Sequence, residues 1–442
     1  MTNEQENRKV IVIHARGITY PNMMQYLDTT NSNSFFKNQH SKKNIKKLQP
    51  IYNAVTIANI ASFETGVNPS VHGIIGHTYA LKENDTLIPV SGFSQRFDKE
   101  TFWERADLNG RKVLKVGDLT FHGKYTNHSN VHTLGQGEQI GESQRIILTP
   151  SNRIKENTTI NYFNEQGATP FQFQKFYADP ILFYQLPNDI NNLYLDNDYD
   201  SQNGFIAKVK HDFWFEKTID TDSDVLQAFR LKWNQKGENI NLYIRPSFRN
   251  RGYPESFIRE IDKKIGPSKG WPNIYFYASG IIDDITLVEE INEEVDYVID
   301  VFNFAVKNDD YDLIMLDYPL MDRLGHSFLN QKDSSDKIQK HYANAFLRME
   351  EDFKLIADFA EKNNYELIIT SGHGFSPIHT SIDPNLLLKE HNINSDFKDS
   401  EWEAIGLTGK VAAHFYINER HSQDDKELIS NKIESFLSAF IF

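Results

Sequence analysis

Three short segments and one isolated histidine carry the side-chain types that bind metal ions or attack an electrophile. Asp322 and His326 are four residues apart, and on a helical turn or tight loop both side chains can point at one ion. Ser371-Gly372-His373-Gly374 is a second segment, His414 stands alone, and Thr56 offers a hydroxyl nucleophile. Each pattern is common when taken singly. Their order and placement along the chain favour one shared site with metal-assisted or nucleophilic chemistry.

The elements that must position these residues are predicted from hydrophobic periodicity. Short continuous apolar runs indicate strands buried on both faces, and apolar residues at helical spacing indicate long amphipathic helices. Helix and strand alternate, which favours an α/β fold with a doubly wound, mostly parallel sheet flanked by helices. Ligands bind outside the carboxyl ends of such strands. The predicted strands are 10–13, 112–116, 312–316, 367–370 and 411–417, and the predicted helices are 287–306, 342–360 and 426–437.

The stretch from 122 to 284 differs from the rest in composition. It is rich in Asn, Asp, Gln and aromatic residues, and short runs such as 240–244 have a β-like pattern. We predict an inserted α+β cap over 122–284, and a discontinuous core formed by 1–121 and 285–442. The cap would lie over the ligand end of the sheet and select the organic part of a substrate.

Composition limits the chemistry. The 442 residues contain no cysteine, so a disulfide, a thiolate metal site and a cysteine nucleophile are all excluded. A transition metal would therefore need His and carboxylate ligands. The formal net charge of −14 argues against a nucleic-acid polymer or an anionic membrane as the main partner. Lys42, Lys43, Lys46 and Lys47 form a small basic cluster of the kind that is usually a solvated loop.

The polar N-terminus lacks the apolar run of a signal peptide, and no stretch approaches the roughly 18 apolar residues of a membrane span. We therefore expect a cytoplasmic location without a membrane partner.

The residues around these segments resemble a known family. The segment 53–74 contains Thr56, Asn59, Thr65-Gly66 and His72-Gly73, and it is similar to the nucleophile segment of type I phosphodiesterases/nucleotide pyrophosphatases, of the alkaline phosphatase superfamily. The segment 322–326 resembles the family's Asp-x-x-Gly-His element, and 371–374 resembles its Ser-Asp-His-Gly element. His414 falls where the last metal-binding histidine of the family is expected.

The resemblance implies roles for individual residues. Asp322, His326 and His414 would hold one divalent metal, and Thr56 would be transiently phosphorylated. Asp with two His suits zinc, although manganese or iron would also fit. Asn59 would help to hold a nonbridging phosphoryl oxygen, and His373 would belong to a second metal site. The implied substrate is a small anionic, phosphate-containing molecule.

The sequence departs from the family pattern at that second site. Arg16, in Ala15-Arg16-Gly17, stands where the family has an aspartate, and Gly372 stands where it has another. A dication held only by His373 and Thr56 should bind poorly, because hard and borderline ions need charged ligands. We hypothesise that Arg16 replaces the missing metal, since its guanidinium can donate to a phosphate-like group and the altered pocket still attracts an anion.

His373, freed from a metal, would then accept the proton of Thr56. His14, His77 and His122 are possible helpers, although a structural role is favoured for each. Three functions stay open. The first is a one-metal hydrolase or phosphoryl transferase of the phosphodiesterase type. The second is a non-catalytic anion-binding protein, and the third is a repurposed enzyme acting on a carboxylate, sulfate or acyl substrate.

Overall fold

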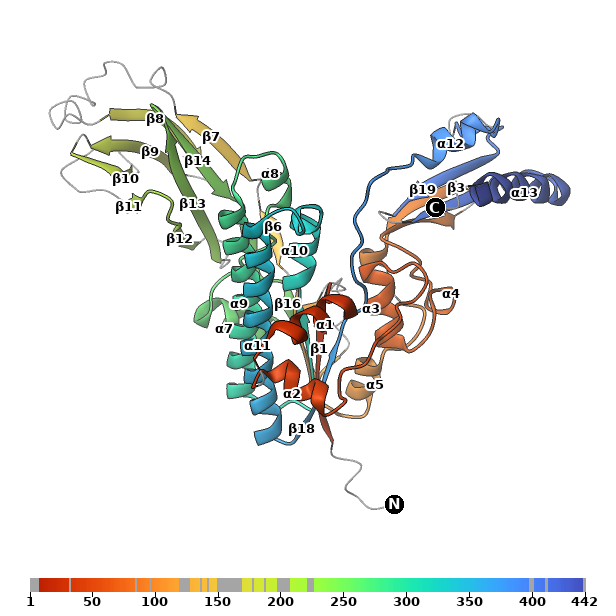
Figure 1. Ribbon diagram of the computed structural model, residues 1–442, viewed down its shortest axis with the longest axis horizontal. Coiled ribbons are helices and arrows are strands. Elements are labelled where there is room, and N and C mark those ends of the chain that lie inside the picture. The colour runs from red at the N-terminus through yellow and green to blue at the C-terminus, as the bar shows by residue number, and fades with distance from the viewer. Residues whose placement is uncertain are drawn as a thin grey trace. The chain divides into compact units, whose positions relative to one another are not determined.

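The computed structural model divides the chain into two compact units. The core unit comprises Met1–Gly135, Gly252–Phe257 and Val298–Phe442, and the insert unit comprises Gln136–Arg251 and Ile258–Tyr297 (Figure 1). The structure describes residues 8–31, 33–83, 86–95, 97–118, 128–135, 137–140, 143–148, 169–176, 179–186, 188–196, 207–220, 226–396, 401–409 and 412–439.

The core unit is built on a six-stranded sheet with the order β16-β5-β4-β17-β1-β18. All neighbouring strands run parallel except β16, which is antiparallel to β5. The fold is therefore the expected α/β architecture with a mostly parallel sheet. The strands are β1 (Lys9–Ala15), β4 (Val113–Asp118), β5 (Val131–Gly135), β16 (Gly252–Tyr253), β17 (Leu313–Tyr318) and β18 (Tyr365–Thr370).

The centre of this sheet is apolar on both faces, as the continuous hydrophobic runs predicted. Ile11 and Ile13 of β1 are fully buried, and β1 lies between β17 and β18 in register. The four sheet strands predicted from these runs are confirmed with small differences at their ends. Strands β5 and β16, in contrast, fall within the range 122–284 predicted for the insertion, and both are strands of the central sheet.

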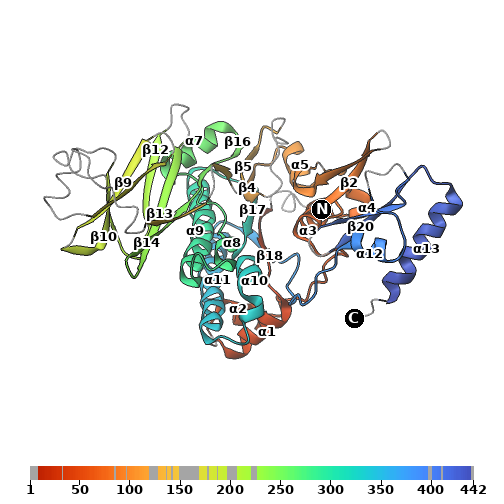
Figure 2. The ribbon, with the colours of Figure 1, turned by 90° about the horizontal axis from the view of Figure 1, so that it is seen from above.

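Helices cover both faces of the sheet. Figure 2 shows α9, α10 and α11 on one side and α3 and α5 on the other. No helix among the described residues is long and apolar enough to span a membrane. The helices associated with this unit are α1 (Tyr20–Thr29), α2 (Phe35–Ser41), α3 (Thr56–Thr65), α4 (Pro69–His72), α5 (Phe102–Leu108), α9 (Asp284–Asn308), α10 (Leu320–Phe328), α11 (Asp336–Lys362), α12 (Pro384–Glu390) and α13 (Gln423–Ala439).

The strand predicted around His414 exists but lies outside the central sheet. It is β20 (Ala413–Ile417), which pairs antiparallel with β19 (Ala404–Thr408) in a separate two-stranded sheet. Phe415 and Ile417 pack on an apolar cluster supplied by α12, α13 and β19. The residues of β20 are mostly half-buried, which is typical of a strand in a small peripheral sheet. A central parallel strand would be buried on both faces. A second small sheet pairs β2 (Thr78–Glu83) with β3 (Thr86–Ser91).

The insert unit is mainly antiparallel β-structure. It contains two four-stranded sheets, β11-β10-β9-β8 and β12-β13-β14-β7, and the short pair β15-β6. Leu231, Trp233 and Leu242 lie at the centre of its apolar core. Its strands are β6 (Glu138–Ile140), β7 (Gln144–Leu148), β8 (Thr169–Phe176), β9 (Asp179–Leu186), β10 (Asp189–Asp196), β11 (Ala207–Lys210), β12 (Phe215–Asp220), β13 (Leu226–Lys236), β14 (Asn239–Arg245) and β15 (Ser247–Arg249), and the nearby helices are α7 (Glu255–Lys264) and α8 (Ile274–Ala278).

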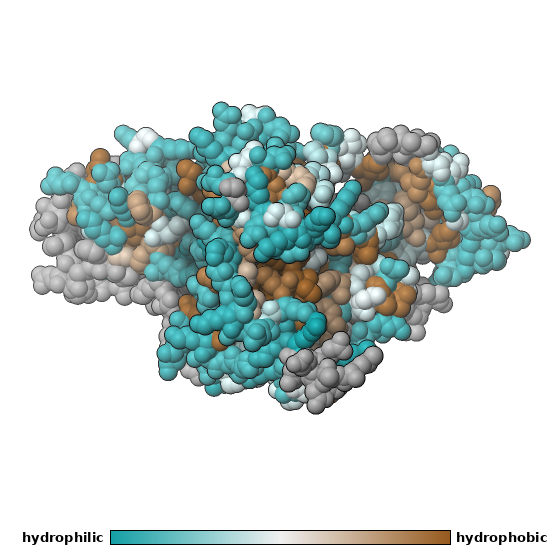
Figure 3. Space-filling model, turned by 60° about the horizontal axis from the view of Figure 1, so that its bottom comes forward, coloured by the Kyte–Doolittle hydropathy of each residue, from teal (hydrophilic) through white to brown (hydrophobic). Residues whose placement is uncertain are grey.

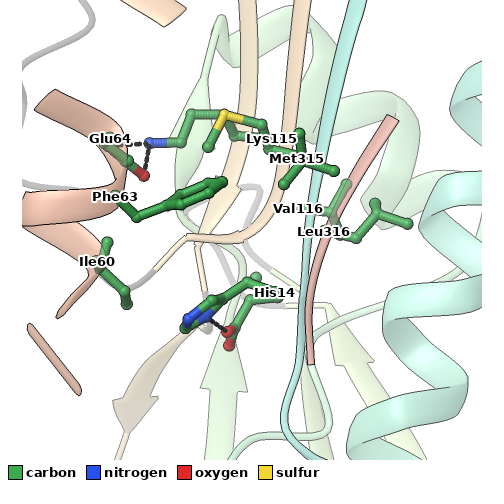
Figure 4. Close-up of a pocket in the computed structure, with 11 residues that line it drawn as sticks. His14, Ile60, Phe63, Glu64, Lys115, Val116, Met315 and Leu316 are labelled. Carbon is green, nitrogen blue, oxygen red and sulfur yellow. Dashed lines mark hydrogen bonds and ion pairs between the residues drawn. The ribbon is translucent and has the colours of Figure 1, made fainter. Parts of the chain in front are cut away.

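A buried ion pair anchors α3 to the central sheet. Lys115 Nζ of β4 lies 3.2 Å from Glu64 Oε1 of α3, and both side chains are almost fully buried. Trp103 Nε1 of α5 donates to Glu64 Oε2 at 2.8 Å, and the Lys115 ammonium lies 4.6 Å from the centre of the Trp103 ring. Figure 4 shows the pair beside Phe63. Because α3 begins at Thr56, this contact also fixes the candidate nucleophile.

Breaking this pair should destabilise the protein strongly. Lys115→Met leaves the Glu64 carboxylate buried without its cation, and removing one partner of a buried pair costs about 3–5 kcal/mol. We expect a loss of that size in the free energy of unfolding, measured by urea denaturation. Glu64→Gln added to Lys115→Met removes the unpaired charge and should recover most of the loss.

Lys354→Met is the matched control for this measurement. Lys354 forms an exposed pair with Asp358 on α11, and such pairs contribute about 1 kcal/mol at most. Equal losses for the Lys115 and Lys354 variants would contradict an anchoring role for the buried pair.

Candidate active site

The site residues gather at the carboxyl ends of three adjacent strands. Arg16 follows β1, Asp317 lies near the end of β17, and His373 comes shortly after β18. Asp322 is in the first turn of α10, and Thr56 is the first residue of α3. The parallel order β17-β1-β18 brings these ends to one edge of the sheet, where ligands bind in open α/β folds.

Thr56 and His373 form a direct pair. Thr56 Oγ1 lies 3.0 Å from His373 Nε2, and both residues are buried. His373 Nδ1 lies 3.2 Å from the Gly374 carbonyl oxygen, which can only accept a hydrogen bond. The proton of the neutral ring is therefore on Nδ1, and the Nε2 lone pair faces the Thr56 hydroxyl, which donates to it. Burial lowers the pKa of His373, despite the opposing effect of Asp322, and so favours this neutral form.

Arg16 is held between two carboxylates. Its Nε lies 2.9 Å from Asp317 Oδ1, and its Nη1 donates to Asp322 Oδ2 at 3.0 Å. The Arg16 side chain is only 4% exposed, and its Nη2 has no hydrogen-bond partner. Gly17 makes this arrangement possible, because a Cβ at that position would lie 2.6 Å from the backbone nitrogen of Asp322. One donor atom of Arg16 therefore remains available to a ligand.

Asp322 remains charged although it is buried. Burial raises its pKa, but Arg16, Arg323, His326 and His373 together outweigh that effect and lower it. Its Oδ1 has no hydrogen-bond partner and lies 3.7 Å from His326 Nε2 and 3.9 Å from His373 Nε2. Arg16 occupies the other oxygen, so Asp322 is shared between a guanidinium and whatever its free oxygen binds.

His414 lies in a different environment. Its Nε2 is buried without a hydrogen-bond partner, and it would lie 3.0 Å from a Cβ placed on Gly76. The Asn53 amide nitrogen would lie 3.5 Å from that same Cβ. Burial lowers the pKa of His414.

The fit of a metal can be judged from these atoms. The free Asp322 Oδ1 and His414 Nε2 are suitable donors that nothing else satisfies. However, the described part of the chain contains no group of three or more His, Asp or Glu side chains arranged to hold an ion. The predicted ligands Asp322, His326 and His414 are thus not assembled as a set, and Arg16 already neutralises one of them.

Side chains from β1 and α3 lie close to Gly372. A Cβ on Gly372 would lie 3.1 Å from His14 Nε2 and 3.0 Å from Asn59 Cβ. His14 Nδ1 lies 3.4 Å from Asp317 Oδ1. The imidazole therefore fills space into which an aspartate at 372 would extend. Asn59 donates its side-chain amide to the Val55 carbonyl at 2.9 Å.

Asp317 is a residue of this cluster that the sequence analysis did not predict. It contacts His14 of β1 and Arg16, which follows β1, and thus links the end of β1 to β17. The sequence feature that could have identified Asp317 is its position directly after the apolar run 312–316. Of the other proposed helpers, His77 packs against Phe93, with ring centres 5.1 Å apart, and His122 lies outside the described residues.

A second histidine, His72, contacts helix α3, which begins at Thr56. His72 is fully buried, and its Nδ1 accepts from the Ile74 backbone at 3.1 Å. The His72 proton is therefore on Nε2, which donates to Ser62 Oγ at 2.9 Å. This contact ties the middle of α3 to the turn after α4. His72 thus positions the helix and cannot act as a base toward Ser62 in this tautomer.

Comparison with known proteins identifies the family. The chain matches the family described as Type I phosphodiesterase / nucleotide pyrophosphatase over residues 10–439. No curated protein and no solved structure matches it. The match spans nearly the whole chain, and the mostly parallel sheet with flanking helices is consistent with the alkaline phosphatase superfamily. This family comprises hydrolases of small phosphate-containing substrates such as nucleotides. The protein belongs to the type I phosphodiesterase/nucleotide pyrophosphatase family.

Proposed function

We propose that this protein is a phosphodiesterase-type hydrolase or phosphoryl transferase in which Thr56 is the nucleophile and His373 is its general base. The observation that carries the proposal is the 3.0 Å contact between Thr56 Oγ1 and His373 Nε2. A base within hydrogen-bond reach, itself oriented by a third group, is the geometry of an activated hydroxyl. The Gly374 carbonyl supplies that third group.

The proposed reaction has two balanced steps. Thr56 Oγ1 forms a bond to phosphorus as its proton moves to His373 Nε2. The bond from phosphorus to the leaving oxygen breaks, and its electron pair departs with that oxygen, which takes a proton from water. In the second step the hydroxide left by that water attacks the phosphothreonine phosphorus. The bond from phosphorus to Oγ1 breaks with its electron pair on Oγ1, and Oγ1 takes its proton back from His373 Nε2. The Asp322 Oδ1, 3.9 Å from His373 Nε2, would stabilise the imidazolium that exists between the two steps.

Two features support binding of the anionic substrate beside Thr56. Helix α3 begins at Thr56 and has no side-chain cap, so its first backbone N–H groups are available to an anion. Arg16 Nη2 is a second buried donor without a partner. We propose that Arg16 donates to a phosphoryl oxygen and so performs part of the task of the missing second metal.

The surrounding charges change how Arg16 can act. Its positive charge is compensated by Asp317 and Asp322, and Arg323 Nη1 lies 3.7 Å from Asp322 Oδ2. The charges of these two arginines and two aspartates sum to zero, so the cluster does not attract anions through its net charge. Substrate binding is therefore proposed to depend on individual hydrogen-bond donors, namely Arg16 Nη2 and the first backbone N–H groups of α3. Asn59, one turn after Thr56, is proposed to contact a nonbridging oxygen.

A metal at Asp322, His326 and His414 is a separate part of the proposal. The two unpartnered atoms Asp322 Oδ1 and His414 Nε2 support it, and family members generally use divalent metals. An ion there would require the three side chains to come closer together. Zinc suits this donor set best, and the proton transfer from Thr56 to His373 does not depend on it.

A non-catalytic anion-binding protein is the second candidate. The ion pair between Arg16 and Asp322 favours it, because Arg16 neutralises a metal ligand that the family uses. A substrate with a carboxylate, sulfate or acyl group in place of phosphate would use the same donors.

Removal of the nucleophile tests the catalytic proposal. Thr56→Ala should abolish turnover of bis(p-nitrophenyl) phosphate, and His373→Gln should lower kcat by about 10²–10⁴-fold, the usual contribution of a general base. Thr65→Ala is the control, since Thr65 lies on the same helix and only donates to the Ala61 carbonyl. If the wild-type protein turns over no phosphoester or sulfate ester with zinc or manganese added, the catalytic proposal fails.

Restoring the family carboxylates tests the role of Arg16. In Arg16→Asp/Gly372→Asp, the guanidinium is removed from Asp322 and two ligands are added at the second site. We expect metal content to rise from about one ion per chain toward two, measured by plasma emission spectrometry after dialysis against zinc. Arg16→Gln alone should remove the ion pair with Asp322 without adding a metal ligand.

Two outcomes would contradict this account of Arg16. One is a wild-type protein that already binds two zinc ions per chain. The other is an Arg16→Asp/Gly372→Asp variant whose zinc content does not change. His14→Ala added to the double variant provides room for the new carboxylate, since His14 Nε2 would be its nearest side-chain nitrogen.

A further inference from the structure

A large cavity lies in the core unit beside β18, and neither Thr56 nor His373 lines it. Its volume is about 850 Å³, within the range of about 300–1,000 Å³ typical of small-molecule sites. Helices α1, α2 and α11, the segment 43–48 and strand β18 line it. Figure 3 brings forward the side of the molecule where β18 and α2 lie in Figure 1, and apolar residues gather there.

Much of the cavity lining is apolar. Strand β18 contributes Tyr365, Leu367 and Ile369, which share one face because strand side chains alternate. The opposing walls are side chains of α1, α2, α11 and the segment 43–48, namely Met23, Phe35, Phe36, Ala357, Ala360, Ile45 and Leu48. Leu48 is 61% exposed, so this wall is open to solvent. A ligand that covers these side chains would gain from burying apolar surface.

The cavity lining also includes polar side chains. Thr19, Thr370 and Ser371 are neutral, and Lys43, Lys46 and Glu361 are charged.

Lys42 and Lys47 are the sequence neighbours of these two lysines, and all four lysines of the basic cluster are exposed. On a chain with a net charge of −14 this is a local excess of positive charge over one acidic group.

Strand β18 is the edge of the central sheet, which raises the possibility of an added β-strand. The cavity, however, lies on the side-chain face of β18 and not only along its hydrogen-bonding edge. An unbranched apolar chain fits that face better than a peptide backbone, which would leave its N–H and C=O groups without partners among these side chains.

We propose that this cavity binds a single-chain anionic amphiphile, an alkyl carboxylate whose chain lies against β18 and whose head group pairs with Lys43 and Lys46. The apolar side chains of the lining account for the chain, and the two lysines account for the charge. The proposal is independent of catalysis, because the cavity lining does not include Thr56, Arg16 or His373.

Calorimetric titration of the full chain with dodecanoate, below its micellar concentration, tests the proposal. We expect saturable binding of about one molecule per chain. Dodecyltrimethylammonium has the same chain with the opposite charge, and should bind at least about tenfold more weakly, a difference of about 1.4 kcal/mol. Lys43→Glu/Lys46→Glu should weaken dodecanoate binding by a similar factor. Lys389→Glu, at an exposed lysine of α12, makes the same kind of charge change elsewhere and should have no effect.

Filling the cavity provides an independent variant. Ala357→Trp on α11 should abolish binding while the circular dichroism spectrum is retained, and if that variant does not fold, the surface lysine variants still decide the question. Three results would overturn the proposal: no saturable binding of dodecanoate, equal binding of both amphiphiles, or unchanged binding in a folded Ala357→Trp variant. Equal binding would instead indicate an apolar surface for a protein partner.

Discussion

The arrangement of the site depends on the ion pairs of Arg16 with Asp317 and Asp322. Three buried charged groups meet within hydrogen-bond distance: Arg16 after β1, Asp317 near the end of β17 and Asp322 in α10. Removing one of them would leave a buried charge without its partner, which is costly. Their mutual compensation holds the ends of two neighbouring strands and the first turn of α10 in one geometry. In this geometry Asp322 Oδ1 and Arg16 Nη2 have no hydrogen-bond partner.

Helix α3, which begins at Thr56, is positioned by contacts of a different kind. Glu64 ties α3 to Lys115 of the sheet, and the fully buried His72 ties Ser62 to the turn beyond α4. Both contacts lie toward the carboxyl-terminal half of α3, so the first turn remains open at Thr56. A helix whose amino terminus has no side-chain cap can bind an anion, because its first N–H groups have no partner within the helix. Thr56, which pairs with His373, is the first residue of this helix.

Much of the fold was predictable from the residues. The apolar runs of the sequence predicted strands β1, β17 and β18, and apolar residues at helical spacing predicted the long helix α11. The structure confirms these elements. The strand that carries His414 was also predicted, but its sheet was not, because a half-buried seven-residue run is compatible with a central or a peripheral position. The site residues Thr56 and His373 were predicted as a nucleophile and its base, and the structure brings them together. Asp317 was missed because a single acidic residue after a strand is too common a signal.

The sequence by itself determined which side chains exist to do chemistry: a hydroxyl at 56, a guanidinium where the family has a carboxylate, and no thiol anywhere. It also determined that the parallel strands would bring their carboxyl ends together, since apolar runs between long amphipathic helices have few other solutions. The tertiary structure alone decided how the charges are shared. Whether Arg16 faces a substrate or a carboxylate depends on distances of a few ångströms between residues three hundred positions apart, and Coulomb energies in a buried site change steeply over that range. That is why the pairing of Arg16 with Asp317 and Asp322 could not be predicted from residue types and spacing.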